Sequence, residues 1–250
     1  ARLCEKAIEF GIELEHVHRL TEKRQLAKYF QHRVRFYTFG QFRIVTDTEE
    51  VHFEKKWPRK YRNERMPFIK TLTRYKPGRL QNNNVLGKLS WEHLKELDWE
   101  KKVEPDNFKT IINRARKRDI KLQEINPFIH KNGRLGLSKV CWIDVVAFEK
   151  QCRMLREKIK SYSEWDVNYF FYLYKGRYLP GDKNNVPEWV QEKADKLEDD
   201  FVNTLMRITK QEEKRGNLAL AKKWYQEGIK RVSGHKLKSF RDRLKNCNSR

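Results

Sequence analysis

The chain has 250 residues, of which 38% are apolar and 12% aromatic, and its formal net charge is +22. This aromatic content excludes a disordered chain, because disordered chains lack the apolar surface that offsets ordering entropy. The excess of positive charge indicates a polyanionic partner, either nucleic acid or an anionic membrane surface. No apolar run approaches the roughly 18 residues that a membrane span needs. We therefore expect a cytoplasmic protein without a membrane segment.

The cysteines and histidines form no recognisable site. Neither a CxxC pair nor a disulfide framework is present, which is typical of reduced cytosolic thiols. His16 and His18 are two residues apart, so a helix would point them to different faces. We expect no metal, no cofactor and no disulfide among the four scattered cysteines, Cys4, Cys141, Cys152 and Cys247.

Residues 1–32 are predicted to be a helical lead-in. Apolar residues recur there at near-helical spacing, and the chain begins at Ala1 without an initiator Met or a signal-peptide pattern. We therefore expect residues 1–32 to be the end of an upstream region, and the chain to be a fragment of a longer protein.

From residue 33 the pattern becomes that of strands. Residues 34–39 alternate, residues 42–45 follow Gly40-Gln41, and Val51 and Phe53 alternate again after a polar turn. This pattern predicts a small antiparallel sheet.

Two helices are expected after the sheet. The first begins at Pro67, whose missing N–H costs nothing in a first turn, and ends at Lys76-Pro77-Gly78. The second begins near Asn83 or Asn84, and the boundaries within residues 87–104 stay open.

A third helix, residues 107–118, is the most informative segment. Asp106 is a suitable N-cap, and one apolar face follows at helical spacing. A second face carries groups that can contact base edges and phosphates, namely Thr110, Asn113, Arg114 and Lys117.

A hairpin is predicted over residues 127–138, because Asn132-Gly133 separates two short alternating runs. The order of sheet, three helices and hairpin is that of a winged helix, with the hairpin as its wing. Residues 33–124 also contain 23 Lys and Arg against 13 Asp and Glu, which favours a polyanion as the partner of this part.

Helical patterns fill the rest of the chain. They cover residues 148–160, 167–174, 187–214, 218–232 and 237–246, with breaks at glycines. Helix pairs joined by short turns that contain glycine, such as Gly216, suggest tetratricopeptide-like hairpins. The fold class expected is mixed and mainly α, with a winged-helix domain at 33–144 and a helical domain at 145–250.

Several motifs resemble the bacterial transcriptional activator domain and the winged helix that precedes it in the antibiotic regulatory protein family. The activator-domain motifs are "WIDVVAFEK", "LYKGRYLPGD", "EWVQEKADKLEDDFVNTL" and "KRGNLALAKKWYQEGI". The winged-helix motifs are "FYTFGQFRI", "FKTIINRARK" and "KNGRLGLSKVCWIDV". The opening "LCEKAIEFGIELEHVHRL" is similar to the segment before this module in very large ATPase-type activators. The resemblance implies the DNA-binding output module of such a regulator, with RNA polymerase and upstream domains of the same chain as further partners.

The candidate DNA contacts follow from the helix and the wing. Asn113 and Arg114 would reach base edges. The flanking or phosphate-binding residues would be Asn107, Lys109, Thr110, Arg116 and Lys117 on the helix, Lys131 and Arg134 on the wing, and Lys60, Arg62 and Arg65 ahead of the first helix. The alternatives are an ordinary solvated basic face and a polar hairpin tip.

Two other clusters have ordinary interpretations. Glu198-Asp199-Asp200 fits a solvated helix face better than a metal site. A second cluster is aromatic, and helical packing explains it better than base stacking does. Its members are Trp165, Tyr169, Phe170, Phe171, Tyr172, Tyr174 and Tyr178. No phosphate loop, nucleophile elbow or HExxH motif is present, so we expect no enzyme.

Three functions remain open. The first is sequence-specific binding of double-stranded DNA, in which tandem or dimeric binding to repeated half-sites fits such a module. The second is a helical-repeat protein-interaction scaffold with a non-specific or non-DNA-binding winged helix. The third is RNA binding, although the common stacking motifs are absent.

Overall fold

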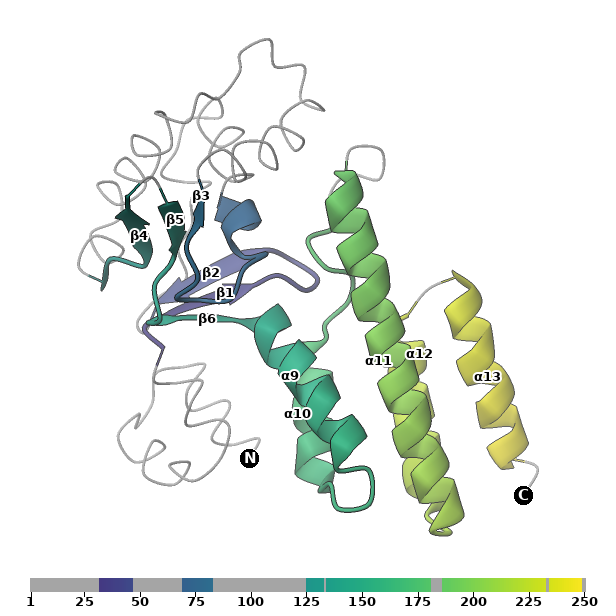
Figure 1. Cartoon of the computed structure of the whole chain (residues 1–250). Coiled ribbons are helices and arrows are strands. Elements are labelled where there is room, and N and C mark those ends of the chain that lie inside the picture. The colour runs from purple at the N-terminus through teal and green to yellow at the C-terminus, as the bar shows by residue number, and fades with distance from the viewer. Residues whose placement is uncertain are drawn as a thin grey trace. The chain divides into compact units, whose positions relative to one another are not determined.

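The structure is a computed structural model that describes residues 32–46, 69–82, 125–132, 134–180, 186–232 and 234–248. It is mainly helical with a small sheet of few strands, which confirms the expected mixed, mainly α class (Figure 1). The chain divides into two compact units at Ile143 and Asp144, and residues 38–42 group with the second unit. Outside the described residues lie the predicted helical lead-in up to residue 31, the predicted helix that begins near Asn83 or Asn84, and the predicted helix at 107–118. Val51, Phe53 and Pro67 also lie outside them.

The first unit contains a three-stranded mixed sheet. β1 (Val34–Tyr37) pairs antiparallel with β2 (Arg43–Thr46), as the alternation predicts, and Val34 lies opposite Thr46. On the other side of β1 lies β6 (Cys141–Ile143), which pairs with it in parallel. The prediction of a purely antiparallel sheet is therefore wrong here, because β6 returns to β1 through a long connection that permits parallel pairing.

A second sheet has the order β3-β5-β4. β4 (Phe128–Lys131) and β5 (Arg134–Leu137) form the predicted hairpin, and β3 (Gln81–Asn82) pairs antiparallel with β5. Asn132 has a φ of 50°, the left-handed conformation that two-residue hairpin turns require. The sequence did not predict β3, since two residues are too few to show an alternation.

A helical segment precedes β3. Residues 69–72 are helical, and Ile69 and Leu72 are buried, as their spacing predicts. The segment ends in a turn, in which the Thr73 hydroxyl donates to the Lys70 carbonyl at 2.7 Å. The helix therefore ends at Leu72, earlier than the predicted end at residues 76–78, because the turn at Thr73 interrupts it. Gly78 follows with a φ of 84°, a conformation that glycine adopts without strain.

The second unit consists of five described helices (Figure 1). α9 packs against α10 and α11, and α12 packs against α11 and α13. Each corresponds to a predicted helix, with ends that differ by a few residues. Their bounds are α9 (Asp144–Glu157), α10 (Glu164–Leu173), α11 (Glu188–Lys214), α12 (Leu218–Ile229) and α13 (Gly234–Asn248).

Stacked aromatic rings form the centre of the second unit. Phe201 of α11 stacks on Phe170 with ring centroids 5.0 Å apart, and on Tyr174 at 4.2 Å. Phe148 of α9 packs against the same two rings. Phe171 and Tyr178 are also buried, so core packing is the right interpretation for most of this aromatic cluster.

Asp144, the first residue of α9, fastens the connection between β1 and β2. Its buried carboxylate accepts hydrogen bonds from the Thr38 amide at 2.7 Å, the Thr38 hydroxyl at 2.5 Å and the Phe39 amide at 3.1 Å. The Val145 amide, the next along the chain, donates a further bond to the same carboxylate at 2.7 Å. Burial raises the pKa of Asp144 to about 6, although these four hydrogen bonds act in the opposite direction.

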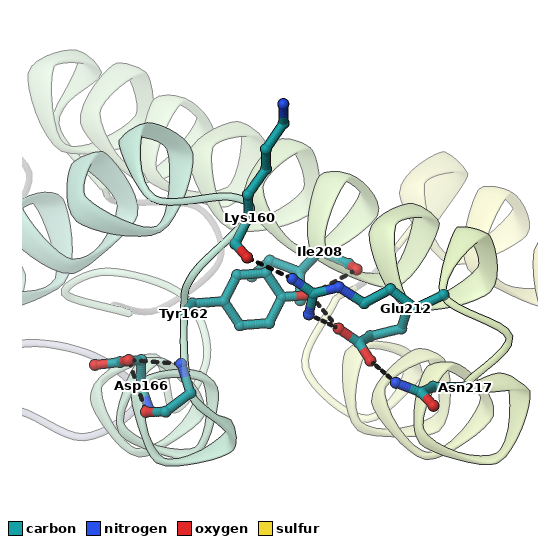
Figure 2. Close-up of polar contacts among 8 residues, drawn as sticks. Lys160, Tyr162, Asp166, Ile208, Glu212 and Asn217 are labelled. Atoms are coloured by element: carbon teal, nitrogen blue, oxygen red, sulfur yellow. Dashed lines mark hydrogen bonds and ion pairs between the residues drawn. The ribbon is translucent and has the colours of Figure 1, made fainter.

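Glu212 holds the connection between α9 and α10 against the turn between α11 and α12 (Figure 2). Its carboxylate accepts hydrogen bonds from the Tyr162 hydroxyl, the Arg215 guanidinium and the Asn217 amide, at 2.7, 2.7 and 2.6 Å. Arg215 also donates to the Lys160 carbonyl at 2.6 Å. Because Glu212 is almost fully buried, this network determines how the two helical pairs meet.

Candidate nucleic-acid interface

The hairpin of β4 and β5 is firmly attached at its base. Phe128, Leu135 and Leu137 are buried, so one face of the hairpin packs into the first unit. The Gly78 amide donates to the Leu137 carbonyl at 2.7 Å. Gly136 lies so close to the Arg79 carbonyl that only a residue without a Cβ fits there. The hairpin is therefore packed directly against the loop before β3.

The tip of this hairpin carries the two predicted wing residues. Lys131 of β4 lies directly opposite Arg134 of β5, and both side chains are exposed. Neither makes a hydrogen bond or an ion pair with any residue in the described ranges. The structure thus brings these two cations together at a protruding turn, where they can meet a phosphate group without first breaking an internal salt bridge.

Further cations lie on the segment next to the hairpin. Lys76 and Arg79 are exposed in the loop before β3, and within the described part of the chain their side chains are unpaired. The exposed Lys139 follows β5, and its aliphatic stem lies within van der Waals reach of Gly78. The sequence analysis did not single out these three residues.

The whole surface formed by residues 69–82 and 125–140 contains no acidic residue. We call it the basic hairpin surface. It has no Asp or Glu, and of its seven Lys and Arg residues only Lys70 is partly buried. The exposed cations are Arg74, Lys76, Arg79, Lys131, Arg134 and Lys139. Asp and Glu are frequent elsewhere in the chain, with 34 in total, so their absence from two adjoining segments is a local property. That absence was the sequence signal that could have identified Lys76, Arg79 and Lys139.

The other predicted contacts have no described position. On the predicted recognition helix these are Asn107, Lys109, Thr110, Asn113, Arg114, Arg116 and Lys117, and ahead of the first helix they are Lys60, Arg62 and Arg65; all lie outside the described residues. Among the predicted site residues, only Lys131 and Arg134 are therefore placed by the structure.

The chemistry of the basic hairpin surface is electrostatic. Lys and Arg side chains that protrude from a rigid hairpin bind phosphate oxygens, and the released counterions make such binding strongly dependent on salt. The exposed His130 beside Lys131 adds a ring that can donate or accept a hydrogen bond. This arrangement suits a nucleic-acid backbone.

The described ranges show no metal-binding cluster. No three His, Cys, Asp or Glu residues within them come together as metal ligands. Burial raises the pKa of the Cys141 and Cys152 thiols to about 12, so neither of these two cysteines is a thiolate nucleophile at neutral pH. None of the described helices is both long and apolar enough to cross a membrane.

Comparison of the chain with models of protein families and with curated proteins found no match.

Proposed function

We propose that the chain binds double-stranded DNA in a sequence-specific way, as the output module of a bacterial transcriptional regulator. The observation that carries the proposal is the basic hairpin surface, on which exposed cations occur without any acidic residue. Segments that need to stay soluble usually mix charges of both signs, whereas a surface of one sign attracts a partner of the other.

The order of elements in the first unit supports a winged helix. Strands β1 and β2 come first, a helical segment at 69–72 follows, and β3 then joins the hairpin of β4 and β5 in one sheet. In a winged helix such a hairpin is the wing. On this proposal the wing, residues 127–138, contacts the DNA backbone or minor groove, and the helix at 107–118 lies in the major groove.

The second unit fits a tetratricopeptide-like activator domain. α11 and α12 form a helical hairpin through a short turn at Gly216, whose φ is 80°. Hairpins of this kind present helical faces to other proteins. RNA polymerase, upstream domains of the same chain and a second copy on repeated half-sites are the proposed protein partners, and no catalytic step is assigned.

The test has two stages, both with the full 250-residue chain. Bound sites are first selected from a random duplex library at physiological salt, and we expect a consensus sequence. The chain is then titrated with the selected duplex over a series of salt concentrations. Removing both wing charges in Lys131→Gln/Arg134→Gln should lower the slope of log affinity against log salt by about 0.9 for each lost phosphate contact.

A charge-matched control separates contact from net charge. Lys238 and Arg241 are exposed cations on α13, and Lys238→Gln/Arg241→Gln removes the same charge from the second unit. We expect this control to bind the duplex as the wild type does. Equal losses in both variants would show that overall charge, and not the hairpin, drives binding.

The same experiments also distinguish sequence-specific DNA binding from the two other functions. A salt-dependent curve without any consensus would favour the helical-repeat scaffold with a non-specific winged helix. Displacement of the duplex by structured RNA at equal concentration would favour RNA binding. Either result would contradict the proposal.

A further inference from the structure

We propose that the second unit has a binding pocket for a small molecule that carries a phosphate or carboxylate group. The pocket has a volume of about 350 Å³ and lies where α11, α12 and α13 meet. None of the residues that line the pocket belongs to the basic hairpin surface, so this proposal does not rest on DNA binding.

Three helices contribute to the walls of this pocket. Asn203, Met206, Arg207 and Lys210 line it from α11, at the spacing that places side chains on one helical face. Tyr225 comes from α12 and Arg243 from α13. The lining therefore combines three cations with an amide, a thioether and an aromatic ring.

The three cations are available to a ligand. Arg207, Lys210 and Arg243 are exposed, and within the described ranges none of them makes an ion pair or a hydrogen bond through its side chain. Guanidinium groups bind phosphate and carboxylate in a bidentate way, and an ammonium group adds a point charge. Asn203 can donate a further hydrogen bond through its amide.

No acidic residue lines the pocket, and two acids on α11 already have partners. Residues 144–250 contain 16 Asp and Glu, but none lines the pocket. On α11, Asp199 pairs with Lys236 at 2.8 Å, and Glu213 accepts a hydrogen bond from Tyr225 at 2.7 Å. Three cations around one hollow repel one another, and an anionic ligand removes that repulsion.

The position of Arg243 is fixed by the packing of α13. Phe240 of this helix is fully buried and lies 6.2 Å from the Tyr225 ring, measured between centroids. Gly228 permits this approach, because a Cβ there would stand 3.3 Å from the Phe240 ring. Lys236, near the start of α13, is paired with Glu198 and Asp199 on α11. The backbone around the pocket is thus held by helix packing, so binding need order only the exposed side chains.

The size and lining of the pocket favour a small molecule over a nucleic-acid backbone. Small-molecule pockets range from about 300 to 1,000 Å³ and are concave with a few convergent polar groups. Met206 and Tyr225 also offer apolar surface inside the pocket, which suits the body of an organic anion. A phosphate backbone needs an extended row of cations, whereas these three line one hollow.

The experiment uses the full chain and four probes: phenyl phosphate, benzoate, inorganic phosphate and benzyl alcohol. Binding is measured by calorimetry and by shifts of backbone amide resonances. We expect saturable binding of phenyl phosphate or benzoate with shifts along α11 and α13, weaker binding of inorganic phosphate, and none of benzyl alcohol. The tighter of the two aromatic anions identifies whether phosphate or carboxylate is preferred.

Variants test whether the pocket is the site. Arg207→Gln and Arg243→Gln should each weaken binding of the preferred probe by about tenfold, which corresponds to one lost charge-assisted hydrogen bond. Lys238→Gln/Arg241→Gln should bind it as the wild type does. Thermal unfolding of each variant shows whether the unit is still folded. If Arg243→Gln does not fold, Lys210→Gln replaces it as the second pocket variant.

Three results would overturn the proposal. They are the absence of saturable binding by either aromatic anion, equal affinity for benzyl alcohol, and equal losses in the pocket variants and in the charge-matched control. A loss of duplex affinity in Arg207→Gln/Arg243→Gln but not in the control would assign the pocket to a nucleic-acid backbone, which would also overturn it. Failure of the DNA selection alone would leave the probe titrations unaffected.

Discussion

Gly136 of β5 lies against the backbone carbonyl of Arg79, and a Cβ at this position would stand 2.5 Å from that oxygen. No side chain fits at such a distance from a backbone atom, so any other residue must displace the hairpin from the loop before β3. The same contact holds Arg79 beside the wing. Gly136→Ala, which adds a single methyl group, therefore tests whether the position of the hairpin matters for DNA binding.

Gly136→Ala should weaken binding to the selected duplex and lower the melting temperature of the chain. The matched control is Gly216→Ala, which has open space around the new Cβ but a φ of 80°. The left-handed conformation costs the control about 1–2 kcal/mol of stability, and its DNA affinity should not change. Fluorescence anisotropy and thermal unfolding measure the two effects. Unchanged affinity in Gly136→Ala would mean that the hairpin is not part of the interface.

Lys76→Gln/Arg79→Gln tests two residues of the basic hairpin surface that were not among the predicted DNA contacts. Because both side chains are expected to contact phosphates, affinity for selected and random duplexes should fall by the same factor. The salt slope should fall by about 0.9 for each contact. A loss confined to the selected duplex would show instead that these residues contribute to sequence readout.

Arg114→Ala tests the predicted recognition helix. If this residue reads a guanine, the variant should lose about 1–3 kcal/mol of binding free energy and relax the preference at one position of the consensus. Lys109→Ala should instead weaken all duplexes alike, as expected for a phosphate contact. Repeating the selection with each variant gives the two base preferences. An unchanged consensus and affinity in Arg114→Ala would disprove the assignment.

The sequence predicted the elements that have a clear period. The five helices of the second unit show an apolar repeat long enough to recognise, and Asn132-Gly133 marks the hairpin turn directly. β3 escaped prediction because it has two residues, and its pairing with β5 depends on Gly136, which is distant in sequence. Such tertiary relationships leave almost no local pattern.

The residues of the candidate sites could likewise be predicted only where they belong to a local sequence motif. Lys131 and Arg134 could be found from their turn, since a charged tip belongs to a local motif. Lys76 and Arg79 join them only through the packing of two segments about 50 residues apart. The pocket between α11, α12 and α13 was not predicted, because its lining comes from three helices whose order in sequence does not show which faces meet.

Asp144→Asn tests the attachment between α9 and residues 38–39. The carboxylate accepts four hydrogen bonds, whereas an amide replaces one acceptor oxygen with an NH₂ group that faces donors. Each buried donor left without an acceptor costs about 1–3 kcal/mol. Thermal unfolding followed by the helical circular dichroism signal should therefore show a clear loss of stability.

A control for this substitution is Asp166→Asn at the exposed start of α10. Asp166 accepts from the Ser163 amide and hydroxyl at 2.9 and 2.7 Å in a capping box. Since water can replace these bonds, the loss should be about 1 kcal/mol or less. Equal losses in the two variants would show that the bonds of Asp144 to residues 38–39 add no more stability than an exposed capping box does.

Glu212→Gln should reduce stability in a way that depends on pH. Burial tends to raise the pKa of Glu212, but hydrogen bonds from Tyr162, Asn217 and Arg215 outweigh it and hold the pKa below the ordinary 4.5. A carboxylate with a lowered pKa adds stability that is present above pH 4.5 and is lost as the pH falls through its folded value. At pH 7 the variant should therefore be less stable by about 1–3 kcal/mol.

The difference between wild type and Glu212→Gln should shrink when urea unfolding is repeated at successively lower pH below 4.5. Glu157→Gln is the control, because Glu157 is exposed at the end of α9 and, within the described ranges, makes no hydrogen bond or ion pair through its side chain. The control should match the wild type across the series. A difference for Glu212→Gln that stays constant down to low pH would mean that shape and hydrogen bonding, and not the charge of the carboxylate, stabilise the junction between the two helical pairs.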